Sequence, residues 1–190
     1  MRQKVKMMRK PLLAGAALMV LVAMLSSCAA VDWSASRIDQ EANEALQVFR
    51  QDVNGAEIFL NQAAGYLVFP RVIKAGLGIG AETGEGVLRV GDQSVDYYRT
   101  TSGSIGFQAG AQAKSIVIAF LTQSSLDQFR GSSGWKVGID GSVALIDIGA
   151  GKTIDTDNIR DPVVGFVFGS KGLMYNLTFE GSKFTKLRKE

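Results

Sequence analysis

The stretch "KAGLGIGAETGEGVL", residues 74–88, has the glycine spacing that most resembles a phosphate-binding loop. In such loops the glycines form the turn between a strand and a helix, and the helix N-terminus meets the phosphate. Here the glycines lie inside an alternation of apolar and small residues, turn and strand follow, and Glu82 and Glu85 would repel a phosphate. The pattern predicts a strand whose glycine side allows a sharp bend or close approach of another element, and no nucleotide site. The three glycines are Gly76, Gly78 and Gly80.

Two further motifs imitate ligand loops. "GAGKT", residues 149–153, copies the end of a Walker A loop, but Ile146 stands where the first glycine belongs, and acids and a proline follow. "DTDNIR", residues 155–160, begins like a calcium loop, but Ile159 occupies a ligand position and Arg160 replaces the required glycine. We interpret both segments as turns and expect no metal site; a loose surface calcium site is the weaker alternative.

The chain has no histidine, which removes the commonest general base near neutral pH and the usual nucleophile-activating triads. Two pairs of carboxylates remain as candidates for acid–base chemistry. Because acids in glycine-rich turns are usually solvated or capping groups, we expect neither pair to be catalytic. The sequence thus predicts a protein that is not an enzyme and binds no cofactor. The pairs are Glu82 with Glu85 and Asp155 with Asp157.

The N-terminus has the organisation of a secretory signal peptide. A basic segment precedes an apolar run of residues 11–25, which is shorter than the about 20 residues of a transmembrane helix, although a permanent anchor is the alternative. "LSSC" then resembles the lipobox at which bacterial lipoproteins are lipidated, and Cys28 is the only cysteine. We expect a signal peptide over residues 1–27, lipidation of Cys28, and a tether over residues 28–35 that leads to one domain, residues 36–190.

Removal of the signal peptide changes the charge. Five of the 21 basic residues precede Cys28, which leaves 16 basic against 18 acidic residues and a net charge of −2. The basic pI of the whole chain therefore gives no support for nucleic acid as a partner, and we expect none.

Helical periodicity marks the start of the domain. Ser36 with Asp39 fits a capping box, and apolar residues then recur at helical spacing. A second helical piece spans about residues 55–64. Packing against the core is the simpler reading of the apolar face; a membrane-surface helix is the alternative, although the polar face is mixed in sign. The apolar positions are Ile38, Ala42, Ala45, Leu46, Phe49 and Val53.

After Gly65 the period changes from 3.6 to 2, which predicts strands. "GYLVFP" reads as a strand that stops at Pro70, and "SIVIAFL" as a strand buried on both faces. Further strands are expected at "GSIGFQAGAQA", "WKVGIDGSVAL" and "GLMYNLTF", with a short helix near residues 124–129. The fold class predicted is α+β: N-terminal helices packed on a glycine-rich, strongly curved, mostly antiparallel β-sheet or partly closed barrel.

These motifs together resemble the SYLF lipid-binding domain family. The resemblance rests on "NQAAGYLVFPRVIKAGLGIGAETGEGVL", "SIGFQAGAQAKSIVIAFL", "WKVGIDGSVAL" and "GLMYNLTFEG", in this order, over about residues 42–181. It implies a non-enzymatic domain; eukaryotic members bind phosphoinositide-containing membranes, some fungal members bind actin, and bacterial members are commonly exported, often as lipoproteins. This chain has no SH3 module and no strongly basic first helix, so the resemblance implies general lipid binding or an envelope role.

The resulting expectation is a lipoprotein whose domain binds anionic phospholipid. Arg71 and Lys74 are the candidate headgroup contacts, with a solvated strand edge as the alternative. The other hypothesis is a structural or protein-interaction module that docks an envelope protein and touches lipid only through its acyl anchor. Ala29 after the cysteine is not the aspartate that retains many lipoproteins in the inner membrane, so we expect sorting to the outer membrane.

Overall fold

The structure, a computed structural model, describes residues 33–147, 161–172 and 181–189. The chain divides into two units, residues 1–32 and 33–190, and the description below concerns the second. Several predictions concern residues outside the described ranges. They are the signal peptide, the lipidation of Cys28, the turns at residues 149–153 and 155–160, and most of the strand expected at "GLMYNLTF".

Two helices open the unit: α2 (Ala35–Asp52) and α3 (Ala56–Gln62). The expected cap at Ser36 is wrong by two residues, because Ser34 has extended backbone angles and its side chain accepts a hydrogen bond from the Arg37 backbone N–H. Asp39, the expected partner of that cap, instead accepts hydrogen bonds from the Ser94 and Tyr97 hydroxyls at 2.7 and 2.8 Å.

The apolar face of α2 is buried, as predicted, and it packs against the sheet. Phe49 lies 5.3 Å from Phe166 and 5.2 Å from Phe168 between ring centroids, and Phe59 of α3 contacts Phe166 edge-on. Aromatic pairs in tilted or edge-on geometry add about 1 kcal/mol each to the burial of their area. None of the described helices is both long enough and apolar enough to cross a membrane.

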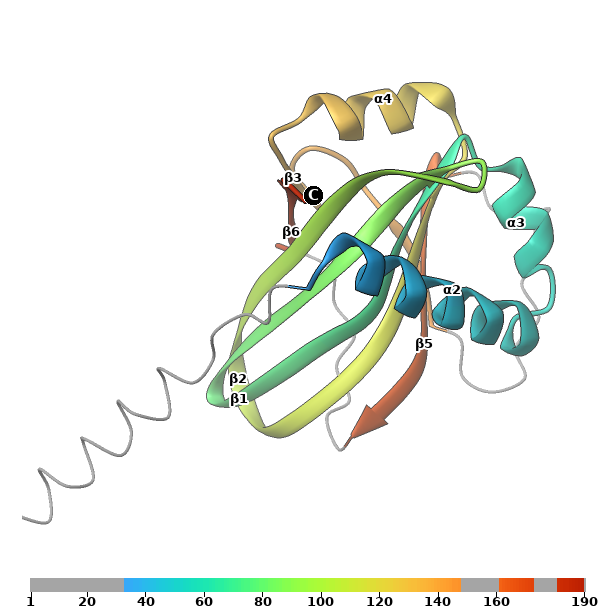
Figure 1. Cartoon of the computed structure of the whole chain (residues 1–190). Coiled ribbons are helices and arrows are strands. Elements are labelled where there is room, and N and C mark those ends of the chain that lie inside the picture. The colour runs from blue at the N-terminus through green and yellow to red at the C-terminus, as the bar shows by residue number, and fades with distance from the viewer. Residues whose placement is uncertain (1–32, 148–160, 173–180, 190) are drawn as a thin grey trace, which may run out of the picture. The chain divides into compact units, whose positions relative to one another are not determined.

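The sheet is built on two very long strands, β1 (Gly65–Val90) and β2 (Gln93–Phe120), which pair antiparallel along their length. Both strands bend back on themselves, as Figure 1 shows in green and yellow. The prediction that the first strand stops at Pro70 is wrong. A register shift between Phe69 and Val72 leaves Pro70 without a ladder partner, so its missing N–H costs nothing and the strand continues.

Four shorter strands of the described residues join this sheet: β3 (Gly134–Lys136), β4 (Ala144–Asp147), β5 (Val163–Gly172) and β6 (Lys183–Leu187). The strand order is β3-β6-β2-β5-β4 with β1 also on β2, and among the described strands only β4 and β5 pair in parallel. The single strand expected at "WKVGIDGSVAL" is wrong, because a turn closed by Asp140, whose carboxylate accepts from the Lys136 N–H at 2.7 Å, separates β3 from β4.

Glycines allow the two halves of β1 to lie against each other. A Cβ added to Gly86 would lie 2.3 Å from the Val68 carbonyl oxygen, and one added to Gly84 would lie 2.6 Å from that of Arg71. No side chain fits at these distances, so the backbones meet directly. The predicted α+β class with a strongly curved, mostly antiparallel sheet is confirmed. Of the two possibilities expected at Gly76, Gly78 and Gly80, the structure shows the sharp bend: Gly78 has a φ of 74°, and a Cβ added to Gly76 would lie 2.4 Å from the Gly80 Cα.

The end of β2 runs between two clusters of buried side chains. Val117 and Ala119 face the cluster under α2 and α3, whereas Ile116, Ile118 and Phe120 face a second cluster under α4 (Gln123–Gly131). The prediction that this segment is buried on both faces is therefore confirmed. The short helix expected near residues 124–129 is α4, which lies on a different side of the curled sheet from α2 and α3 (Figure 1).

Candidate functional site

The bend of β1 exposes large apolar side chains. Leu77 and Ile79 are 83% and 73% exposed, and Ile73 on the approach to the bend is 47% exposed. Gly78 lies between the first two with a φ of 74°, and the register of β1 with β2 shifts at the same place. A positive φ favours glycine, so the sequence itself specifies the bend. We call Ile73, Leu77 and Ile79 the apolar bend.

The apolar bend faces outward because the other side of the strand carries buried polar groups. Lys74 and Glu82 of β1 and Lys114 of β2 are 5%, 6% and 3% exposed. The Lys114 ammonium lies 3.0 Å from the Glu82 carboxylate, and Gln112 is buried beside Lys74, its partner in register. A strand has two faces of alternating residues, so a polar interior forces the apolar residues into solvent here.

Arg71 lies on the same outer face as the apolar bend. Arg71, Ile73 and Leu77 are exposed, and the residues that alternate with the first two, Val72 and Lys74, are buried. The structure therefore separates the two predicted headgroup contacts: Arg71 points outward, whereas Lys74 points into the folded ribbon.

Two arginines lie against one tryptophan at the other end of this outer face. The Arg37 guanidinium carbon is 4.7 Å from the Trp33 ring centroid, and that of Arg71 is 5.9 Å from it. Both distances are within the about 6 Å range of cation–π contacts. We call Trp33, Arg37 and Arg71 the tryptophan–arginine cluster.

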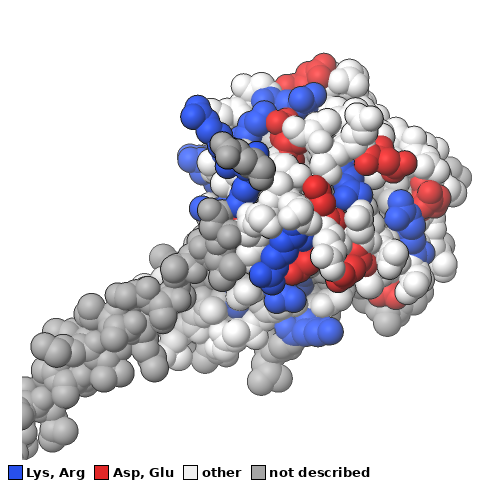
Figure 2. All heavy atoms as spheres, in the orientation of Figure 1, with Lys and Arg blue, Asp and Glu red and all other residues white. Residues whose placement is uncertain are grey.

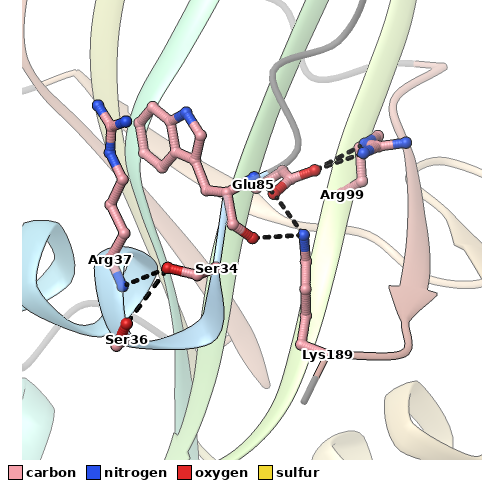
Figure 3. Close-up of polar contacts among 7 residues, drawn as sticks. Ser34, Ser36, Arg37, Glu85, Arg99 and Lys189 are labelled. Atoms are coloured by element: carbon pink, nitrogen blue, oxygen red, sulfur yellow. Dashed lines mark hydrogen bonds and ion pairs between the residues drawn. The ribbon is translucent and has the colours of Figure 1, made fainter.

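A buried carboxylate fixes the backbone of this cluster. Glu85 Oε2 accepts a hydrogen bond from the Trp33 N–H at 3.1 Å and lies 3.0 Å from Lys189 Nζ, which also donates to the Trp33 carbonyl at 2.6 Å. The other carboxylate oxygen of Glu85 pairs with the Arg99 guanidinium, as Figure 3 shows. Residue 33 is thereby held to both the long ribbon and the C-terminal segment.

The expected roles of Glu82 and Glu85 as solvated turn residues are wrong. Both lie inside β1, both are 6% exposed, and each is paired with cations. The alternation continues from residue 74 through residue 82, so it could have placed Glu82 within a strand, but it does not show that this carboxylate is buried. The sequence suggests a turn for these two acids because glycines adjoin them and turns are where glycine is commonest.

Charges elsewhere on the unit are mixed. Figure 2 shows Lys and Arg interspersed with Asp and Glu on the face it displays. Within the described ranges, no group of three or more acidic, histidine or cysteine residues is placed to hold a metal ion.

Burial and neighbouring acids raise the pKa of two adjacent tyrosines, Tyr97 and Tyr98. Burial, together with the hydrogen bond donated to Asp39, raises the pKa of Tyr97 to about 12. Burial and the nearby Asp96 carboxylate raise the pKa of Tyr98 to about 12 as well. Both phenols are therefore neutral at physiological pH and serve the packing of β2.

Comparison with known protein families finds a match in the second half of the chain. Residues 101–190 match the Ysc84 family, described as Las17-binding protein actin regulator. These 90 residues are therefore similar to the Ysc84 (SYLF) family. This confirms the resemblance expected from the motifs. The matched segment comprises β2 from Thr101 onward, α4 and β3–β6, so the apolar bend of β1 and the tryptophan–arginine cluster precede it. No curated protein matches the chain.

Proposed function

We propose that the chain is a bacterial envelope lipoprotein whose SYLF domain binds anionic phospholipid and catalyses no reaction. The observation that carries the proposal is the apolar bend, where Leu77 and Ile79 are 83% and 73% exposed on a strand whose inner face is polar. Adjacent exposed apolar residues at a projecting bend mark an interaction surface more often than scattered single ones do.

A bilayer interface matches the chemistry of this outer face. Full burial of a leucine or isoleucine side chain contributes about 1.5–3 kcal/mol, so insertion of the apolar bend stabilises the bound state. Arg71 lies on the same face, where a cation adjacent to anionic lipid contributes about 1 kcal/mol. The two contributions act together when the bend enters the acyl region and Arg71 stays at headgroup level.

The predicted acyl anchor would keep the domain close to a membrane. Lipidation of Cys28 would leave five residues to Trp33, and an extended chain of that length spans about 17 Å. The domain would then remain within reach of the membrane surface at all times, which raises its effective concentration there. We assign the protein to the outer membrane, because Ala29 lacks the carboxylate associated with inner-membrane retention.

A protein-interaction role is the second candidate. The matched family is described by its binding to a protein, and an exposed apolar bend would also suit a protein groove. In that case an envelope protein covers Leu77 and Ile79, and the acyl anchor is the sole membrane contact.

Flotation of the unacylated domain, Val31–Glu190, separates the two candidates. All described core residues lie between residues 33 and 189, so this fragment keeps the core intact. The vesicles contain phosphatidylcholine alone or equal parts phosphatidylcholine and phosphatidylglycerol, at low and physiological salt. We expect flotation with the anionic vesicles at both salt concentrations.

Two matched double variants localise the contact. Leu77→Ser with Ile79→Ser removes the apolar bend, whereas Ile58→Ser with Ile139→Ser changes residues that are 50% and 76% exposed elsewhere. We expect the first variant to stay at the bottom of the gradient and the second to float like the parent. If the parent fails to float with any vesicle, lipid binding by the domain is wrong and the protein-interaction role takes its place.

A further inference from the structure

The tryptophan–arginine cluster brings two cations to one aromatic ring at the surface. The Arg37 side chain is 54% exposed, Arg71 is exposed, and Trp33 is half-buried. Their guanidinium carbons lie 4.7 and 5.9 Å from the same ring centroid. The arginines come from different elements, α2 and β1, so the fold assembles this arrangement.

The positive charge of the cluster is only partly compensated. Arg37 forms an ion pair with Glu41 at 3.2 Å, one helical turn away. Within residues 33–147, 161–172 and 181–189, Arg71 has no ion pair, and its one charge-related contact is with the Trp33 ring. Two guanidinium groups within about 6 Å of one ring centroid concentrate positive charge there, and an anion bound beside the ring would be attracted by both.

Hydrogen bonds to the Trp33 backbone also hold the cluster in place. Glu85 and Lys189 hydrogen-bond the N–H and the carbonyl of Trp33, so the indole projects from a fixed backbone. A site whose backbone is fixed before binding loses less conformational entropy when a ligand arrives.

The position of the cluster in the chain selects its partner. Trp33 follows the predicted lipidation residue by five positions, which limits its distance from an acyl anchor to about 17 Å. Tryptophan is enriched at the headgroup level of membranes, and guanidinium groups bind phosphate oxygens through paired hydrogen bonds. Because the anchor would keep this site near the membrane, the phosphate groups of lipids would be present beside it at high local concentration.

We propose that Trp33, Arg37 and Arg71 form a headgroup site that binds the phosphodiester of an anionic phospholipid and turns this face toward the bilayer. The inference rests on the proposed lipid binding and adds to it the residues that recognise the headgroup. Trp33 lies at the interface, the two arginines contact phosphate, and the apolar bend enters the bilayer farther along the same face of β1.

Tryptophan fluorescence tests the site directly. The chain has two tryptophans, so Trp135→Phe in the Val31–Glu190 fragment leaves Trp33 as the sole emitter; Trp135 is 4% exposed and is replaced by another aromatic residue. Vesicles of phosphatidylcholine with equal phosphatidylglycerol are added, and a second set carries brominated acyl chains. We expect a blue shift of Trp33 emission and quenching by the brominated lipid.

Variants that replace arginine with neutral glutamine distinguish binding at this site from attraction by the overall positive charge of the protein. Arg37→Gln with Arg71→Gln should weaken partitioning about 30-fold, which is two contributions of about 1 kcal/mol each. Arg50→Gln with Arg130→Gln removes the same charge from side chains that are 39% and 42% exposed elsewhere, and should change it less than about threefold. Thermal unfolding of each variant establishes that it is folded.

The outcomes distinguish the site from the function. If the parent floats but the Arg37/Arg71 variant partitions equally, or Trp33 emission does not shift, the headgroup site is wrong while lipid binding stands. If the parent binds no vesicle, lipid binding fails and the headgroup site fails with it. If soluble glycerol phosphate alone shifts Trp33 emission as much as vesicles do, the cluster is a site for a free anion and the assignment to lipid is overturned.

Discussion

Lys189 Nζ lies 3.0 Å from Glu85 Oε2 and bridges 104 residues of chain. The two side chains are 7% and 5% exposed, so the pair is buried. The same carboxylate also binds the Trp33 N–H, which makes Glu85 the point where the N-terminal exit of the domain, the long ribbon and the C-terminal segment meet.

Substitution Glu85→Gln should lower the free energy of unfolding by about 3 kcal/mol, because removal of one partner leaves a buried cation without compensation. Urea unfolding of the Val31–Glu190 fragment measures this. Glu57→Gln is the matched control: its ion pair with Arg50 at 2.7 Å is on the surface, with the Glu57 side chain 59% exposed, so it should cost less than about 0.5 kcal/mol. Equal effects of the two substitutions would contradict a structural role for Glu85.

Substitution Gly86→Ala tests the direct contact between the two halves of β1. The new Cβ would lie 2.3 Å from the Val68 carbonyl oxygen, and relief of such overpacking costs about 1–3 kcal/mol. Gly103→Ala is the control, since its Cβ would meet no atom within 4 Å. We expect an earlier urea midpoint for Gly86→Ala and an unchanged one for Gly103→Ala; the folded-back ribbon is wrong if both variants unfold with the parent.

The free energy of unfolding should fall in alkaline solution because Tyr97 and Tyr98 are held in their neutral form by the folded protein. The pKa of both Tyr97 and Tyr98 is raised from 10.0 to about 12 in the folded protein. The neutral phenol is favoured by the fold, so this stabilisation is complete below pH 10 and is lost as the pH rises toward about 12. Denaturant unfolding at a series of pH values should show the decline, and Tyr97→Phe should make it shallower. A pH-independent unfolding free energy over this range would refute the assignment.

The sequence was sufficient for the parts of the fold that follow from periodicity. Ile38, Ala42 and Phe49 recur at helical spacing and are buried in α2, and the continuous apolar run at residues 115–121 is buried on both faces. These predictions succeed because burial on one or two faces is the direct cause of the pattern.

Other features depend on contacts that periodicity does not contain. Pro70 predicts a strand end, but a register shift accommodates it within β1. The alternation at residues 73–82 established a strand without showing which face is inside; the ion pair between Glu82 and Lys114, 32 residues apart, decides that. The sequence does not predict the cluster at Trp33 for the same reason, since Arg37 and Arg71 both reach the Trp33 ring only after β1 folds beside α2.

An environment-sensitive probe at residue 77 tests most directly whether the apolar bend enters a bilayer. The Val31–Glu190 fragment contains no cysteine, so Leu77→Cys or the control Ile139→Cys provides a single thiol for an NBD label at a site that is 83% or 76% exposed. With vesicles of phosphatidylcholine and phosphatidylglycerol, we predict a strong, blue-shifted rise in emission at residue 77 and little change at residue 139. Equal responses at the two positions, or no response at residue 77, would contradict the account.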